Sequence, residues 1–306
     1  MTNNSSEPNQ ATLDGGTMAT RSDSERPWII SISKALWNKP LGFWSFFVLL
    51  FITVLAFGAN WLAPYGIDDS TGIYTASPSM THLFGTDNLG RDVLSRTIFA
   101  GQVSLRVGFM AVSLGTIVGA VAGLVSAYFG GYVDHVIQRI VDVMMSIPTI
   151  LLALTVIASL GADALNVTLA IAISIAPNTT RVARGSALAV KGLDYVTAAT
   201  ALGATPKRVI FRHILPNAAA PLIVIASVQL GTAIITEASL SYLGLGVPLN
   251  VPTWGNMLSG AGLTYMTKAP WMAIFPGLAL TITVLALNLL GDALRDILDP
   301  KLRGSK

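Results

Sequence analysis

The sequence predicts an all-α, polytopic membrane protein with about six transmembrane helices. Of the 306 residues, 52% are hydrophobic and only 11% are charged, and the mean hydropathy is +0.63. A soluble domain carries about 25% charged residues because its surface must face water. The charges here are too few to cover a soluble globule, and several apolar runs reach the length of roughly 20 residues that a spanning helix needs.

The chain begins with a polar tail that differs in composition from everything after it. Residues 1–27 are rich in Ser, Thr, Asn and Gly and are predicted to form a disordered cytoplasmic tail. The first apolar run starts after Pro40, too late for a cleavable signal sequence. Residues 28–306 are therefore predicted to form a single transmembrane domain. The chain has no cysteine, which excludes disulfides and thiolate metal sites.

Six apolar runs account for this transmembrane domain. The third run has the least certain start, because Arg139 and Asp142 lie there, three positions apart, where they can pair with each other. In the second run Gly115, Gly119 and Gly123 recur every four residues, which predicts a face for close packing of another helix. The predicted spans are residues 41–62, 103–129, 140–160, 167–187, 218–243 and 271–290.

The distribution of Lys and Arg predicts which side of the membrane each segment faces. Six spans with the N-terminus inside place both chain ends and residues 190–217 in the cytoplasm, where positive residues concentrate. Of the 19 Lys and Arg residues, only Arg91, Arg96, Arg106 and Lys268 then lie elsewhere. The positive residues behind the net charge of +3 are therefore explained by the membrane topology, and no basic surface for nucleic acid is predicted.

Residues 190–217 carry the pattern of a helix, a tight turn and a second helix. Asp194 is predicted to cap a helix that Gly203 ends, and Thr205 and Pro206 are predicted to start another that runs toward Leu215 and Pro216. This segment also presents small residues beside a basic edge, which lets a partner surface approach the backbone. We predict a docking element here in preference to an ordinary solvated loop. Its small and basic residues include Ala198, Ala199, Ala204 and Arg208.

The same segment resembles the cytoplasmic EAA loop of permeases of bacterial ABC importers. Residues 195–217, YVTAATALGATPKRVIFRHILPN, match the family pattern at Ala198, Ala199, Gly203, Leu215 and Pro216. Thr197 and His213 depart from it, since the family often has Glu and Ile at those places. Three further stretches resemble the second permease of the dipeptide/oligopeptide/nickel group: residues 84–96 (FGTDNLGRDVLSR), 242–258 (YLGLGVPLNVPTWGNML) and 275–300 (FPGLALTITVLALNLLGDALRDILDP).

This resemblance implies a type I permease that works with other chains. The implied partners are a second permease subunit, two ATPase subunits docked on residues 190–217, and an extracytoplasmic substrate-binding protein. ATP and magnesium are expected on the ATPase subunits, with no cofactor and no metal in this chain. No phosphate-binding GxxxxGK[ST] motif and no nucleophile with its base appear in the sequence, so the chain is not expected to be an enzyme.

Glu237 is the one candidate for the translocation pathway. It lies inside the fifth predicted span, where a carboxylate must face protein or water. It could contact a cationic part of the solute, and it could equally be a structural partner for a neighbouring helix. We therefore expect a permease of the bacterial inner membrane for small peptides or a similar solute. The alternatives are a secondary transporter without an ATPase and a permease of the same group for nickel, opines or oligosaccharides.

Overall fold

The computed structural model describes residues 40–259 and 264–298, and within these ranges every regular element is a helix. The prediction of an all-α chain is therefore confirmed, while the predicted tail at residues 1–27 lies outside the described residues. The helices are α2 (Pro40–Phe57), α3 (Ala59–Leu62), α4 (Val93–Phe129), α5 (Gly131–Met145), α6 (Thr149–Leu160), α7 (Ala164–Lys191), α8 (Asp194–Ala201), α9 (Pro206–Val209), the π-helical turn η1 (Ile210–Ile214), α10 (Leu215–Tyr242), α11 (Trp254–Leu258) and α13 (Trp271–Leu298).

All six predicted runs are helical, and four segments of the described chain have the length and composition of a membrane span. These are α2, α4, the continuous helical stretch Pro206–Tyr242 and α13. The pair α5 and α6 forms a fifth if the two helices together make one broken span. The run predicted at residues 167–187 is part of the 28-residue helix α7, but Asn178, Arg181 and Arg184 make α7 more polar than the others.

The third predicted span is divided into two helices rather than continuous. Helices α5 and α6 meet at an angle of 95° across a break of three residues. Pro148 causes this break, because proline has no N–H for a helical hydrogen bond and disfavours a helical conformation in the residue before it. The sequence prediction of one helix over residues 140–160 is corrected on this point.

The centre of the molecule is the close packing of α4 against α7. Gly115, Gly119 and Gly123 all lie on this interface, and all three are buried. A Cβ atom added to Gly119 would lie 2.6 Å from the carbonyl oxygen of Ala176, and one added to Gly123 would lie 2.4 Å from that of Thr180. The predicted packing face is therefore confirmed, and its partner is α7 of the same chain.

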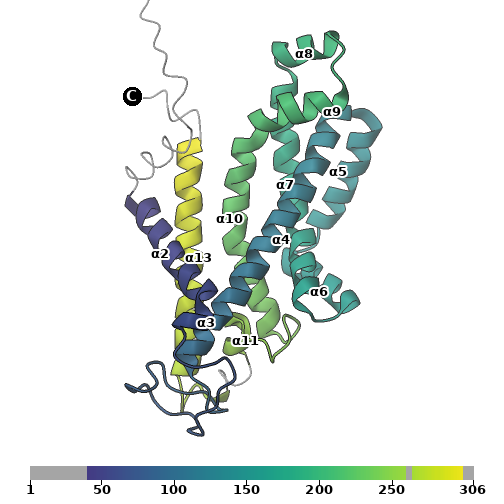
Figure 1. Cartoon of the computed structure of the whole chain (residues 1–306). Helices are drawn as coiled ribbons and strands as arrows, with labels where there is room; N and C mark the ends of the chain where they lie inside the picture. The colour runs from purple at the N-terminus through teal and green to yellow at the C-terminus, as the bar shows by residue number, and fades with distance from the viewer. Residues whose placement is uncertain (1–39, 260–263, 299–306) are drawn as a thin grey trace, which may run out of the picture.

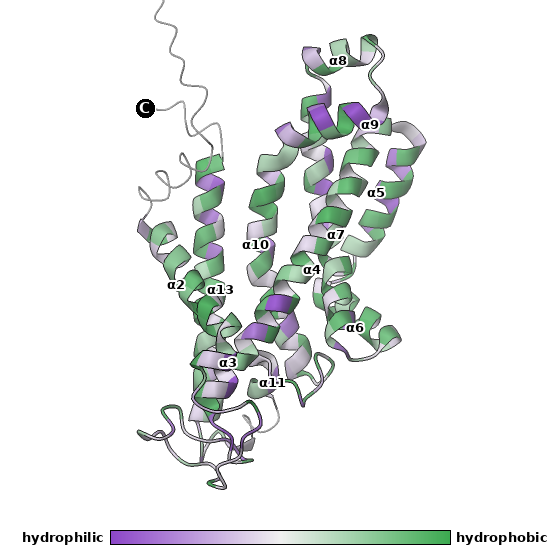
Figure 2. Cartoon of the chain, in the orientation of Figure 1, coloured by the Kyte–Doolittle hydropathy of each residue, from purple (hydrophilic) through white to green (hydrophobic). Residues whose placement is uncertain are grey.

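The elements sort to two ends of the bundle. Helices α8 and α9 lie at the end where α2 begins and α13 finishes, whereas residues 64–92 and α11 lie at the opposite end (Figure 1). Hydrophobic residues predominate on α2 and α6, whereas hydrophilic ones gather at α9 and on the last turns of α13 (Figure 2). This arrangement agrees with the predicted grouping of the chain ends with residues 190–217 on one side of the membrane.

A compact polar cluster lies at the start of α4, at the end of the bundle opposite α8 and α9. The Asp92 carboxylate accepts hydrogen bonds from the backbone N–H and the hydroxyl of Ser95, both at 2.8 Å, and so caps the helix. The His82 Nδ1 atom lies 2.9 Å from Asp92 Oδ1. These residues are buried, which fixes the long loop before α4 to the helix it precedes.

Candidate functional site

The first helix of the 190–217 segment, α8, ends in a Schellman motif at Gly203. Gly203 has a φ of +83° and its N–H donates to the Thr200 carbonyl at 3.0 Å, while the Ala204 N–H donates to the Ala199 carbonyl at 3.1 Å. The predicted helix end at Gly203 is confirmed. The predicted cap at Asp194 is wrong: Leu193 occupies the N-cap position, without a side-chain hydrogen bond, and Asp194 is the first helical residue.

The second helix starts where the sequence predicts but does not stop at the predicted end. Thr205 is the N-cap, its hydroxyl accepts from the Arg208 N–H at 3.4 Å, and Pro206 follows as the first helical residue. The helix then continues through the π turn η1 into α10, with Pro216 in the first turn of α10. Residues 206–242 therefore form one continuous helical rod, bent between α9 and α10 (Figure 1), that joins this segment to the membrane-spanning part.

Buried side chains anchor the segment to the ends of α4 and α7. Val196 of α8, Val209 of α9, and Ile214 of η1 share one hydrophobic cluster with Leu124 of α4 and Ala187 of α7. Burial of each such aliphatic side chain contributes about 1.5–3 kcal/mol. The segment is therefore a packed element with a defined position.

Lys191 adds a polar anchor at the same place. Its ammonium group donates to the carbonyl oxygens of Ala127 at 3.1 Å and Tyr128 at 2.7 Å. These carbonyls belong to the last turn of α4, where a cation satisfies unpaired acceptors and the negative end of the helix dipole. The end of α7, and with it the start of α8, is held to the end of α4.

The face turned away from these anchors is exposed. Leu202 is 89% exposed at the tip of the turn, an unusual position for an apolar residue, and Phe211 is 54% exposed. Of the ten residues predicted for this site, Thr197, Ala198, Gly203, Thr205, Pro206 and Arg208 are exposed, and Ala199 and Ala204 are half-buried. Leu215 and Pro216 belong to the start of α10 and not to the turn. Sequence reasoning missed Leu202 and Phe211, although both are apolar residues in an otherwise polar stretch.

Two ion pairs tie α5 to α7 beside this segment. Arg184 binds the Asp134 carboxylate through two N–H donors, at 2.7 and 2.6 Å, and Arg181 binds Asp142 at 2.6 Å. Arg184, Asp134 and Asp142 line a cavity of about 410 Å³ between the two helices. The predicted local pair of Arg139 with Asp142 is therefore wrong, because Asp142 has a partner on another helix.

Glu237 lies far from the exposed surface of residues 190–217, near the C-terminal end of α10. Its side chain is 0% exposed, and its two oxygens accept hydrogen bonds from the hydroxyls of Ser104 and Ser241, both at 2.8 Å. Ser104 belongs to α4, so the carboxyl group joins α10 to α4. These contacts supply the polar partners that a buried carboxyl group requires. Contact of Glu237 with a transported solute stays a prediction.

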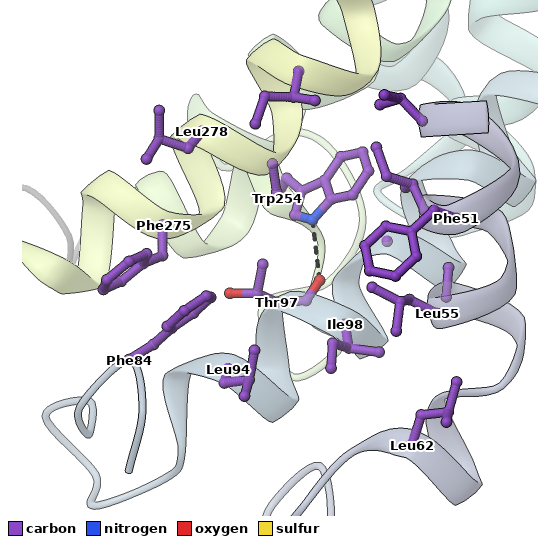
Figure 3. Close-up of a pocket in the computed structure, with 16 residues that line it drawn as sticks. Phe51, Leu55, Leu62, Phe84, Leu94, Thr97, Ile98, Trp254, Phe275 and Leu278 are labelled. Carbon is purple, nitrogen blue, oxygen red and sulfur yellow. Dashed lines mark hydrogen bonds between the residues drawn. The ribbon is translucent and has the colours of Figure 1, made fainter. Parts of the chain in front are cut away.

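An apolar cavity of about 620 Å³ opens between α2, α4 and α13 near Trp254 (Figure 3). Phe51 and Leu55 line it from α2 and Leu278 from α13. The indole N–H of Trp254 donates to the Thr97 carbonyl at 3.1 Å, so this polar atom is satisfied within the chain. The cavity offers no charged group to a polar solute.

Comparisons with known proteins agree on one family. Residues 115–304 match the family described as "Binding-protein-dependent transport system inner membrane component". The chain is similar to the glutathione transport system permease protein GsiD of Pectobacterium atrosepticum, with 44% identity over 259 residues, which is 84% of this chain and 85% of that one. The corresponding protein of Escherichia coli O6:K15:H31 is 43% identical over 260 residues, with the same coverage.

A solved structure has the same fold. It is the inward-facing MetNI methionine ABC transporter. One chain of that transporter matches with a TM-score of 0.53, and the match covers 67% of the present chain and 97% of the transporter chain. Sequence identity is 21%, so this likeness concerns the fold. The predicted type I permease architecture is confirmed.

Proposed function

The chain belongs to the family of binding-protein-dependent transport system inner membrane components, and we propose that it carries small peptides or a similar small solute inward. It is a permease subunit of an ATP-driven importer, as the family and the fold show. The peptide class is supported by relatives that are named for transport of glutathione, a small peptide. Because the family works in a binding-protein-dependent transport system, membership in it disfavours the alternative of a secondary transporter.

The exposed surface of residues 190–217 is the proposed docking site for an ATPase subunit. The single observation that carries this proposal is the continuity of α9, η1 and α10, which links an exposed tip to a helix crossing the membrane. Motion of a docked ATPase would displace the tip, and the rod would transmit the displacement to the helices around the path. The proposed assembly contains this chain, a second permease, two ATPase subunits and an extracytoplasmic binding protein.

We expect the isolated subunit to show no ATP chemistry, because its sequence has no phosphate-binding loop. The purified chain alone should neither bind nor hydrolyse ATP. The complete assembly in proteoliposomes, supplied with its binding protein, should take up a labelled di- or tripeptide only when ATP is present on the ATPase side. ATP turnover by the chain free of all other subunits would contradict the importer assignment. Competition of uptake by nickel, an opine or an oligosaccharide instead of a peptide would correct the solute class.

The proposed orientation places both chain ends and residues 190–217 in the cytoplasm, with residues 64–101 and 244–270 outside. The chain has no cysteine, so single introduced cysteines can be labelled without background. In intact cells an impermeant maleimide should label Ser70→Cys and Asn250→Cys, and it should fail to label Lys207→Cys until the membrane is permeabilised. All three positions are exposed, so differences in labelling report sidedness. The reverse pattern would overturn the topology.

A further inference from the structure

The loop that leaves α10 lies directly on the end of that helix. We define the outer loop as residues 243–253, between α10 and α11. A Cβ added to Gly246 would lie 2.2 Å from the Ser241 hydroxyl oxygen, and one added to Gly255, just after the loop, would lie 2.4 Å from the Ala238 carbonyl oxygen. Only glycine allows such close approach at these two positions. The two ends of the outer loop are thus pressed onto the last turns of α10.

Glu237 is linked to both of these contacts through the hydroxyl groups of Ser241 and Ser104, and the Thr253 hydroxyl of the outer loop also hydrogen-bonds to its carboxyl group. Ser241 donates to Glu237 Oε1 at 2.8 Å and accepts the Val247 N–H at 3.3 Å. Ser104 donates to Glu237 Oε2 at 2.8 Å and accepts the Trp254 N–H at 3.4 Å. A hydroxyl has one proton and two lone pairs. The carboxyl oxygens accept the two protons, so the serine lone pairs face the Val247 N–H in the outer loop and the Trp254 N–H directly after it.

The network is closed to water and has further support inside the loop. Glu237, Ser104 and Ser241 are all 0% exposed. The Asn256 amide donates to the carbonyl oxygens of Val247, Pro248 and Val251, at 3.0, 3.2 and 2.9 Å, and so holds the loop in its folded shape. The Trp254 indole fixes the far end against α4, as Figure 3 shows. Every polar contact that orients the two ends of the loop leads back to α10, α11 or α4.

We propose that Glu237 is a positioning residue, which fastens both ends of the outer loop to α10 and α4. Since α10 is continuous with α9, the outer loop then follows the rod when the coupling surface moves. This second step rests on the proposed function, whereas the fastening itself is a property of the single chain. Glu237 would act on transport through the loop, without touching the solute.

The fastening can be measured on the isolated chain with a cysteine placed in the loop. Val247 is 3% exposed, so Val247→Cys should react slowly with a maleimide and report local opening of the loop. Ser104→Ala and Ser241→Ala each remove one hydrogen-bonded arm and should raise this labelling rate about fivefold. Glu237→Leu removes both arms and should raise it further. Glu237→Gln, which keeps an acceptor and can donate to the serine lone pairs, should stay within about twofold of the parent.

Two controls separate release of the loop from general loosening. Ser239 lies on α10 two positions from Glu237 and donates to the Ile235 carbonyl, so Ser239→Ala should leave the rate unchanged. Asn250→Cys is exposed already and should label equally in every background. Unchanged Val247→Cys labelling in both serine variants, or an equal rise with Ser239→Ala, would overturn the proposal. The serine variants keep the test decisive if Glu237→Leu fails to insert.

Transport by the assembled importer tests the second step, in which the outer loop follows the rod when the coupling surface moves. Ser241→Ala and Ser104→Ala should each lower the maximal uptake rate. Neither should change the amount of ATPase subunit that co-purifies. Glu237→Gln should retain uptake. Normal uptake in both serine variants, together with raised labelling, would overturn the role in transport. Absence of uptake in the parent assembly, with the labelling pattern intact, would instead refute the proposed function.

Discussion

Gly203→Asp is expected to abolish uptake while the chain remains folded and inserted. The φ of +83° costs a residue with a Cβ about 1 kcal/mol or more, because only glycine adopts this conformation freely. No atom lies within 4 Å of an added Cβ, so the chain itself can accommodate the side chain. The aspartate would project beside the exposed Leu202, on the surface where we propose that an ATPase docks.

Co-purification of the ATPase subunits, measured beside uptake, checks this result. Gly192→Asp is the matched control, since it adds the same charge to the same 190–217 segment at a position where φ is −76°. Large residues at Ala198 or Ala199 should act like Gly203→Asp, whereas Thr197→Ala should be mild because the family Glu is already absent. Normal assembly and normal uptake with aspartate at Gly203 would mean that the segment only connects two helices.

Gly119→Leu is expected to prevent folding altogether. The first carbon of the new side chain would meet the Ala176 carbonyl oxygen at 2.6 Å and the Thr179 Cβ at 2.7 Å, so α4 and α7 would have to separate. Overpacking of a core by even a small group costs about 1–3 kcal/mol. Among the described helices, α4 and α7 share the most extensive contact, and leucine adds four carbons to it. The amount of chain that survives detergent extraction as a monodisperse species should fall below detection.

Gly185→Leu serves as the control for this second prediction. Gly185 lies on α7 with no atom within 4 Å of an added Cβ, and it is exposed. The substitution replaces a poor helix former with a good one, which favours the helix by up to about 1 kcal/mol. Normal yield of Gly119→Leu, measured against Gly185→Leu, would contradict the packing described for α4 and α7.

The parts of the structure set by local chemistry were predictable. The turn at Gly203 and the start at Thr205 and Pro206 follow from capping preferences that involve four or five neighbouring residues. The packing face of α4 was predictable because Gly115, Gly119 and Gly123 recur every four residues. The break at Pro148 had its signal in the sequence, but the hydrophobic run on both sides of it outweighed the proline in the prediction of a single span.

Contacts between distant residues were not predictable in the same way. Asp142 has Arg139 three positions away, yet it pairs with Arg181, because the packing of α5 on α7 decides which cation is near. Ser104 and Glu237 are 133 positions apart, and no periodicity relates them. The continuation of α9 into α10 was also missed. Pro216 lies inside this continuous stretch, directly after the π-helical turn η1, in which the Leu215 N–H donates to the Ile210 carbonyl oxygen.

The loose attachment of α2 has a consequence for biosynthesis. Only three of its 18 residues are buried, so most of its apolar surface does not depend on packing within the described chain. Such a helix is stable in the bilayer before any neighbour exists. Its main contact is α13, the final helix of the described chain. Helix α2 therefore lacks its principal partner until α13 has been synthesised, and the walls of the apolar cavity between them can come together only then.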